Sequence, residues 1–293
     1  LVKVGYLLVV VIIYISTGGV KNKTSIQFAD ELISNGIYDI ELSGGKYSEN
    51  ILDELLNLSA KANFQIHNYF PPHEKPFVLN LGSLNPEVGE KSYKHILKAL
   101  EWCSLIGSDH YSFHAGFLLD PRVDELGRKI TDRVLYDRDK SKDFFISRVK
   151  NLYEVASKLD ITLMIENNVL SNNNSLEFES NPLLMCTPEE CNEVLNSLPE
   201  NIKLLVDVAH LKVSANSLKF NPNEMFKMCC DRIGGYHLSD NNGLSDTNQA
   251  FNSESWFWSY LNPLIDYISI EVYSSDLNLL LDQKKLVQLK LNI

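Results

Sequence analysis

Seven side chains capable of metal binding or proton transfer fall at the ends of apolar, β-branched segments of this chain. These segments read F-Q-I-H, Y-S-F-H, L-M-I-E, L-L-V-D-V-A-H, G-G-Y-H and I-S-I-E, and the side chains are His67, His114, Glu166, Asp207, His210, His237 and Glu271. Imidazole nitrogens and carboxylate oxygens bind zinc, manganese and related divalent ions. Because carboxylates are rarely buried unless they are paired or metal-bound, the set predicts a metal-dependent enzyme.

The segments that carry these residues predict strands that alternate with amphipathic helices. Apolar residues recur at helical spacing from Ile96 to Cys103, with Gly107 as a stop signal, and again from Phe145 to Leu159. Thr187-Pro188 and Asp276 are start signals for two later helices. Strands are expected near 4–15, 37–42, 64–68, 110–115, 161–167, 202–208, 233–238 and 267–273.

Eight alternating strand and helix units are the number that closes a (β/α)8 barrel. The length of 293 residues and the 44% hydrophobic content suit one such barrel, so we expect an α/β TIM barrel as a single domain over 1–293. Active sites of this fold lie at the C-terminal ends of the strands, where the seven side chains fall. The apolar run from Leu7 to Ile15 fits the first buried strand, although a remnant of a targeting segment is the alternative.

Charge and cysteine content narrow the classes of partner. The formal net charge is −11, which repels a polyanion, so we expect a small-molecule substrate rather than nucleic acid. The five cysteines form no C-x-x-C pair, and the longest apolar run is too short to span a bilayer. We therefore expect a cytoplasmic protein without membrane contact, and homo-oligomer formation stays open.

Three long connections follow expected strands, at 70–89, 118–141 and 170–185. Loops of this length in a compact domain usually cover or bind a ligand. The second loop mixes arginines, among them Arg122, with aspartates. Two interpretations remain: a solvated loop of mixed charge, or arginines such as Arg122 that bind a substrate phosphate or carboxylate.

The order of the motifs resembles a known superfamily. H-N-Y-F-P-P, F-H-A-G, M-I-E-N, V-D-V-A-H, H-L-S-D-N-N-G and I-E-V, from about Ile37 to Tyr273, are similar to the xylose-isomerase-like barrels, which include sugar-phosphate isomerases and epimerases and the apurinic-site endonucleases. The resemblance implies one divalent ion (Mn, Zn, Co or Mg) held by Glu166, Asp207, His237 and Glu271. In the endonuclease branch it implies a second ion at His67, His114 and Glu166, and a third at His210 and Asp246.

One departure separates the two branches. The endonuclease pattern has an Asp-x-His pair after the seventh strand, whereas this chain reads Asp246-Thr247-Asn248. An amide oxygen is a poorer zinc ligand than an imidazole nitrogen. With the acidic surface, this favours a sugar or sugar-phosphate isomerase or epimerase over a zinc phosphodiesterase acting on DNA. A barrel that only binds a ligand, without catalysis, is the third hypothesis.

The implied ligands predict a reaction. A divalent ion can chelate and polarise an α-hydroxy carbonyl, which acidifies the neighbouring C–H bond. Glu166 and Glu271 would then move that proton through an enediolate, giving isomerisation or epimerisation. We expect His210 to donate to a substrate hydroxyl. His67, His114 and Asn168 would also bind substrate, and Asn168 would orient ligands together with Asn167.

Overall fold

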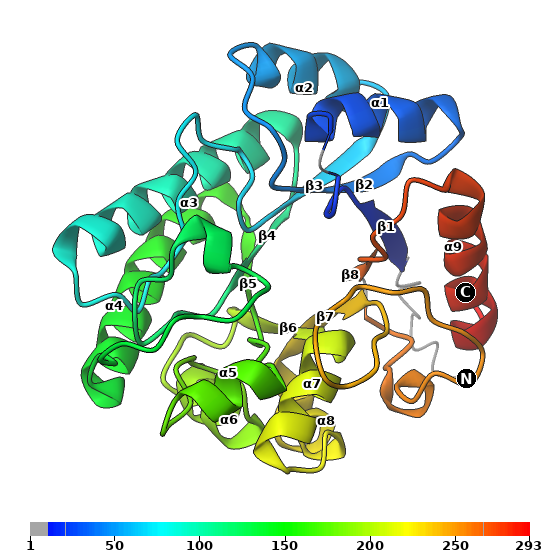
Figure 1. The fold of residues 1–293 in the computed structure, drawn as a ribbon. Coiled ribbons are helices and arrows are strands. Elements are labelled where there is room, and N and C mark those ends of the chain that lie inside the picture. The colour runs from blue at the N-terminus through cyan, green and yellow to red at the C-terminus, as the bar shows by residue number, and fades with distance from the viewer. Residues whose placement is uncertain (1–10, 21, 266) are drawn as a thin grey trace, which may run out of the picture.

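Eight parallel strands close into a barrel in which each strand pairs with the next and β1 pairs with β8. The computed structural model describes residues 11–20, 22–265 and 267–293. Figure 1 looks into the barrel, with helices around its outside, and confirms the predicted (β/α)8 fold. The strands are β1 (Ile12–Ser16), β2 (Asp39–Ser43), β3 (Asn63–His67), β4 (His110–His114), β5 (Thr162–Glu166), β6 (Lys203–Asp207), β7 (Ile233–Leu238) and β8 (Tyr267–Ile270).

The strands lie where the apolar segments predict them. From β2 to β8 each observed strand overlaps its expected range. Within the expected first strand, the structure confirms Ile12–Ile15, while residues 4–10 lie outside the described residues. The strands contain runs of apolar residues because helices cover the outside of the barrel and other side chains fill its inside.

Helices cover the outer face of the barrel, and their ends follow local capping signals. The Thr187 and Asp276 side chains each accept a hydrogen bond at the start of a helix, and Gly107 ends another in the left-handed conformation at φ 71°. The helices are α1 (Ser25–Ser34), α2 (Ile51–Ser59), α3 (Pro86–Ile106), α4 (Arg138–Ala156), α5 (Asn172–Glu177), α6 (Pro188–Asn196), α7 (Val208–Leu218), α8 (Asn223–Met228) and α9 (Leu277–Leu291).

The connection between β7 and β8 departs from the expected alternation. Its described residues contain no α-helix, only a short 3-10 turn at Trp258–Tyr260. The segment is rich in Asn and Ser, and these side chains hydrogen-bond to nearby backbone: Asn252, for example, accepts from the Glu254 N–H at 2.8 Å. The expectation of a helix after every strand was therefore wrong at this position.

Strand register places the polar strand ends side by side. His114 on β4 is the partner of Glu166 on β5, and Asp207 on β6 is the partner of His237 on β7. Below this level, Tyr14, Met164, Leu205 and Tyr267 form a buried cluster. The polar residues therefore lie above a packed interior, as the fold requires.

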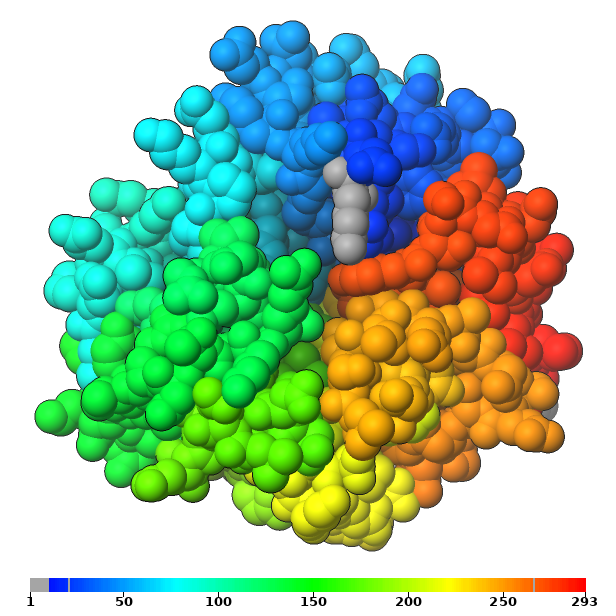
Figure 2. Space-filling view, viewed as in Figure 1, coloured from blue at the N-terminus to red at the C-terminus, as the bar shows by residue number. Residues whose placement is uncertain are grey.

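The loops after the strands surround one end of the barrel. In Figure 2 the segment after β4 (green) and the segment after β7 (orange) face one another across the centre of this end. None of the helices in the described part of the chain has the length and apolar character needed to cross a membrane.

Candidate metal centre

Four strand-end side chains converge inside the barrel mouth. The ligand atoms offered by Glu166, Asp207, His237 and Glu271 all lie within 4.8 Å of one another, and all four residues are buried. His237 Nδ1 is 3.4 Å from Glu166 Oε1 and 3.5 Å from Glu271 Oε2. We call these four residues the central group.

The central group contains polar atoms that the protein itself does not satisfy. Both carboxylate oxygens of Glu166, Oδ2 of Asp207 and Nδ1 of His237 are buried without a hydrogen-bond partner. Leaving such atoms unpaired costs about 1–3 kcal/mol each. A divalent cation bound by three carboxylates and one imidazole would satisfy Oε1 of Glu166, Oδ2 of Asp207 and Nδ1 of His237, so the residues present fit a metal ion.

The electrostatics of the central group also favour a cation. Burial, together with the charge of Glu166, raises the pKa of the Asp207 and Glu271 carboxyls, although His210 and His237 oppose this shift. Burial raises the pKa of Glu166 as well, but the charges of His114 and His237 lower it well below its ordinary value. Three carboxylates buried together repel one another, and a divalent ion would neutralise that repulsion.

A second group shares Glu166 with the first. His67 Nε2 lies 3.4 Å and His114 Nδ1 lies 3.5 Å from Glu166 Oε2, whereas Glu166 Oε1 faces His237 and His210. His67 is held by a 2.9 Å contact between its Nδ1 and Ser112 Oγ. Glu166 therefore turns one oxygen to each group. The structure thus brings His67, His114 and His210 to the same carboxylate.

Asp207 and His210 are positioned by the start of α7. Asp207 Oδ1 accepts from the His210 N–H at 2.7 Å as the helix cap, which leaves Oδ2 for the central group. Asn167 bridges to the same residue, since its Oδ1 accepts from Asp207 N at 2.9 Å and its Nδ2 donates to Asp207 O at 3.2 Å. His210 Nδ1 lies 3.0 Å from Asn167 O, and its Nε2 lies 3.2 Å from Asp246 Oδ2.

The structure brings neither Asn168 nor Arg122 into the two groups. Asn168 is buried and donates Nδ2–H bonds to the carbonyls of Ala115, Gly116 and Leu184, so its amide nitrogen joins the β4 and β5 loops. The Arg122 guanidinium instead contacts Asp124 and Glu125 within its own loop, and its side chain is 59% exposed. Their roles in substrate binding stay predictions.

Sequence reasoning missed Glu41. This residue lies inside β2, is fully buried, and accepts hydrogen bonds from His237 Nε2 at 2.8 Å and from the Tyr267 hydroxyl. Burial would raise the pKa of Glu41, but the positive charge of His237 and these hydrogen bonds lower it to about 2. A charged residue between Ile40 and Leu42 in an apolar segment is the signal that could have revealed it.

Asn248, which stands where the endonuclease motif has histidine, faces Glu271. Its Nδ2 lies 3.4 Å from Glu271 Oε2, and the residue is 4% exposed. The backbone of Asn248 adopts φ 43°, a left-handed conformation that asparagine tolerates better than most residues. In this protein, position 248 therefore contacts a member of the central group.

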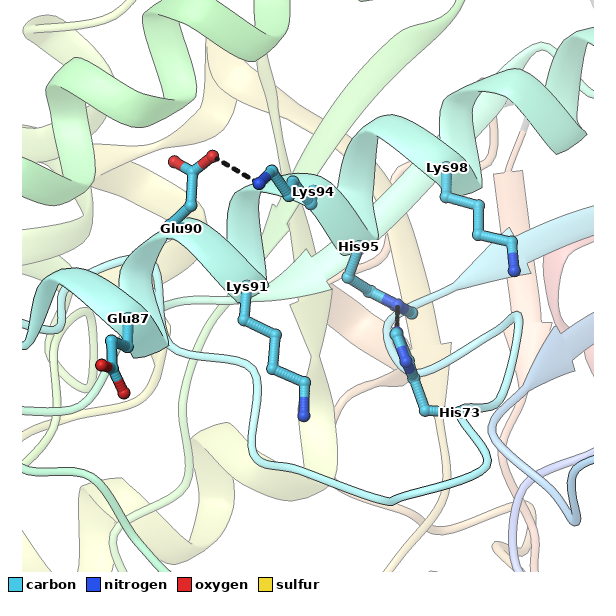
Figure 3. A pocket seen from close by; sticks show the side chains of 7 residues that line it. All are labelled: His73, Glu87, Glu90, Lys91, Lys94, His95 and Lys98. Atoms are coloured by element: carbon cyan, nitrogen blue, oxygen red, sulfur yellow. Dashed lines mark hydrogen bonds and ion pairs between the residues drawn. The ribbon is translucent and has the colours of Figure 1, made fainter.

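A pocket of about 430 Å³ lies on the outside of the barrel, away from these groups. Figure 3 shows it along α3, with His73 and His95 turned toward one another and Lys94 turned toward Glu90. His95 donates its Nε2–H to Asn68 O at 2.8 Å, and Asn68 follows His67 in the chain. This wall of the pocket therefore supports the loop that begins at the second group.

Comparisons with known proteins agree with the barrel fold. The family model described as a xylose isomerase-like TIM barrel matches residues 30–266. Among solved structures, a D-tagatose 3-epimerase-like protein superposes with a TM-score of 0.69 at 18% identity, with 96% of this chain and 97% of that chain covered. An L-ribulose 3-epimerase gives a TM-score of 0.68 at 14% identity, with 97% and 95% covered.

The endonuclease branch also appears among the similar structures. An AP endonuclease, family 2, from Brucella melitensis gives a TM-score of 0.61 at 10% identity, with 90% of this chain and 93% of that chain covered. A search of curated proteins finds no match. Identities this low show the fold alone, whereas the family model spans most of the chain. The chain belongs to the xylose isomerase-like TIM barrel family.

Proposed function

We propose that this protein is a divalent-metal-dependent isomerase or epimerase acting on a sugar or sugar phosphate. The observation that carries the proposal is the convergence of Glu166 and Glu271 on His237 Nδ1, at 3.4 and 3.5 Å. Two buried carboxylates that approach one point could exchange protons with a substrate carbon bound there, each from its own side. That arrangement suits removal and return of a proton on a carbon beside a carbonyl.

The central group would hold the metal through Glu166, Asp207, His237 and Glu271, because its unsatisfied atoms and its charge fit a cation. When bound, a divalent ion polarises carbonyl and hydroxyl oxygens and so acidifies the adjacent C–H bond. The family to which the chain belongs includes metal-binding sugar enzymes, as its sequence motifs imply. We propose one such ion as the resident cofactor, with a second ion at His67, His114 and Glu166 as the alternative use of that group.

The residues of the chain would share the proton transfer. One carboxylate, Glu166 or Glu271, accepts the proton as the C–H bond breaks, and the electron pair moves toward the carbonyl oxygen. The other carboxylate returns a proton to the opposite face, which inverts the carbon. Return to the former carbonyl carbon instead exchanges aldose and ketose, provided that the hydroxyl proton passes from its oxygen to the former carbonyl oxygen.

Histidines around Glu166 would bind the substrate. His114 has the most exposed side chain among the histidines of the two groups, at 26%, so it lies nearest to the solvent. We propose that His114 and His67 bind sugar hydroxyls. His210, held through Nδ1 by Asn167 O, would donate its Nε2–H to another hydroxyl when the substrate replaces the contact with Asp246. The sugar class is supported by the similar structures, described as a D-tagatose 3-epimerase-like protein and an L-ribulose 3-epimerase.

A zinc phosphodiesterase remains the second candidate, because His67, His114 and Glu166 form a further group that could hold an ion. Two observations speak against it. Position 248 contacts Glu271 with an amide instead of supplying an imidazole. Three arginines after β4 also contact carboxylates: Arg122 contacts Asp124, Arg133 contacts Glu125, and Arg138, the first residue of α4, contacts Glu190. Neutralised arginines contribute little to phosphate affinity.

The proposal is tested by measuring bound metal and turnover on the same preparation. Chelator-treated protein is reloaded with Mn²⁺, Co²⁺, Zn²⁺ or Mg²⁺, and each form is incubated with a panel of ketoses, their phosphates and a duplex containing an abasic site. We expect interconversion of a ketose with its epimer or aldose in at least one metal form, and loss of activity on chelation. Cleavage of the abasic duplex without sugar turnover would show that the second candidate is right.

A further inference from the structure

His237 presents its two ring nitrogens to different carboxylates. Nε2 lies 2.8 Å from Glu41 Oε2, a normal hydrogen-bond length. Nδ1 lies 3.4 Å from Glu166 and 3.5 Å from Glu271, and it makes no hydrogen bond. The network therefore assigns a hydrogen to Nε2, where Glu41 accepts it, and leaves Nδ1 to serve the central group.

Glu41 is itself held in place from across the barrel. Its Oε2 also accepts the hydroxyl hydrogen of Tyr267, so one oxygen receives hydrogen bonds from β7 and β8 while Glu41 lies on β2. Glu41, His237 and Tyr267 are all at most 1% exposed. A buried carboxylate fixed by two donors is a rigid acceptor, which can define both the tautomer and the plane of the imidazole.

The geometry argues against a direct ligand role for Glu41. Glu41, His67 and His237 also offer atoms within 4.8 Å of one another, so they could form a third ion group. His237 would then use Nε2 for that ion. A neutral imidazole has one lone pair for a metal, so the same ring could not also serve the central group through Nδ1. Glu41 Oε1 is buried without a hydrogen-bond partner, but Glu41 Oε2 already accepts from His237 and Tyr267, and the central group offers three carboxylates beside His237. We therefore assign Nδ1 of His237 to the central group.

We propose that Glu41 is a positioning residue of the metal centre: it accepts the Nε2–H of His237 and so directs Nδ1 toward a cation shared with Glu166, Asp207 and Glu271. This inference rests on the metal site of the proposed function but not on the sugar reaction. Replacing the carboxylate partner of a metal-binding histidine typically lowers metal affinity about 10- to 100-fold. Glu41 would act in this way without contacting substrate.

The test measures Co²⁺ affinity and the visible spectrum of the Co²⁺ form, using the full chain after removal of bound metal. The variants are Glu41→Gln, which replaces the charged carboxylate with a neutral amide of similar size, and Glu41→Ala, which removes the group. Glu125→Gln is the matched control, because Glu125 is a buried, hydrogen-bonded carboxylate in the β4–α4 loop, outside the metal-type groups. Thermal unfolding of the metal-free variants establishes that each has folded.

We expect both Glu41 variants to bind one Co²⁺ about 10- to 100-fold more weakly, with a changed spectrum, while Glu125→Gln matches the natural protein. Unchanged affinity and spectrum in folded Glu41→Gln and Glu41→Ala would overturn the inference. Loss of one of two bound ions would also overturn it, because Glu41 would then be a ligand. If Co²⁺ binding depends on Glu41 but no sugar reacts, the inference holds and the proposed reaction fails. If the natural protein binds no divalent ion, both fail.

Discussion

Asn167 binds the main chain of Asp207 at two points, with its Oδ1 2.9 Å from Asp207 N and its Nδ2 3.2 Å from Asp207 O. These two hydrogen bonds join the end of β5 to the end of β6, directly after Glu166 on one strand and at a member of the central group on the other. The spacing between the carboxylates of Glu166 and Asp207 therefore depends on Asn167, a neutral side chain that contacts neither carboxylate group.

Replacing Asn167 with alanine should destabilise the protein and disturb the centre together. Two buried main-chain groups of Asp207 would each lose the hydrogen bond to Asn167, so we expect the free energy of unfolding to fall by about 1–3 kcal/mol. Urea denaturation measures this change. Asn196→Ala, at an exposed position, is the control and should change stability by less than about 0.5 kcal/mol. A change at Asn167 no larger than the control would contradict the role assigned to this bridge.

Gly89 in α3 should resist substitution even though it lies inside a helix. A Cβ at this position would lie 2.2 Å from Nη2 of Arg148, whose Nη1 donates to Leu81 O at 2.5 Å and to Ser83 O at 2.9 Å. Gly89→Ala would ordinarily stabilise a helix by about 1 kcal/mol, but here we expect a loss of about 1–3 kcal/mol from the clash.

A double-mutant cycle separates the clash from the helix preference. Gly89→Ala in an Arg148→Ala background should be neutral or stabilising, because the guanidinium that obstructs the methyl group is gone. Equal effects of Gly89→Ala in both backgrounds, measured by urea denaturation, would show that Arg148 is not the cause.

His95 should make stability depend on pH. Burial lowers its pKa to about 4, although the hydrogen bond to Asn68 opposes the shift. Between the unfolded pKa near 6.5 and the folded value, the unfolded chain binds a proton that the folded protein does not. Stability from this group is therefore complete above pH 6.5 and falls as the pH drops toward 4, by about 3 kcal/mol in total.

The measurement is the free energy of unfolding at pH 7.0 and pH 4.5 for the natural protein and for His95→Gln. Glutamine does not titrate, so the variant should lose less stability over this interval. His73, whose Nε2 lies 3.1 Å from His95 Nδ1, is replaced by glutamine in both proteins, so that the remaining histidines cancel in the comparison. Parallel pH dependence in the two proteins would mean that the neutral form of His95 contributes nothing to the pH response.

The role of Glu166 and Glu271 in proton transfer can be separated experimentally from their role as metal ligands. Glu166→Gln and Glu271→Gln each remove a proton acceptor and a negative metal ligand, so metal content must be measured beside rate. In variants that retain the metal, we expect turnover to fall by about 10²- to 10⁴-fold, as is typical after loss of a general base. Full turnover in metal-loaded forms of both variants would show that another group moves the proton. His210, whose Nδ1 lies 3.3 Å from Glu166 Oε1, would then be the next residue to replace.

The sequence predicted the barrel because two local signals coincided: apolar strand segments and polar residues directly after them. The same reasoning located Glu166, Asp207, His237 and Glu271, which the fold then brought together. It overlooked Glu41 because that residue lies within its strand, before Ser43, and a rule based on strand ends does not select it. The described residues between β7 and β8 form no α-helix, and Asn and Ser side chains there hydrogen-bond to nearby backbone instead.

Contacts between distant segments were beyond the reach of local patterns. Asn248 and Glu271 are 23 positions apart, and Glu41 and His237 are 196 positions apart. The barrel brings Glu41 on β2 to His237 on β7, whereas the loop after β7 folds back on the end of β8 to bring Asn248 to Glu271. The loop arginines illustrate the same limit, since composition left two interpretations open and the structure pairs Arg122 with Asp124 and Glu125.

Proton transfer by Glu166 and Glu271 can be followed by the incorporation of solvent deuterium. The metal-loaded protein is incubated in heavy water with a ketose or ketose phosphate, and the recovered sugar is analysed by NMR and mass spectrometry. We expect deuterium at the carbon beside the carbonyl, in both the product and the recovered substrate, and none after chelation of the metal. Conversion of the sugar without any deuterium at that carbon, under conditions where the returned proton exchanges with solvent, would contradict proton transfer by Glu166 and Glu271.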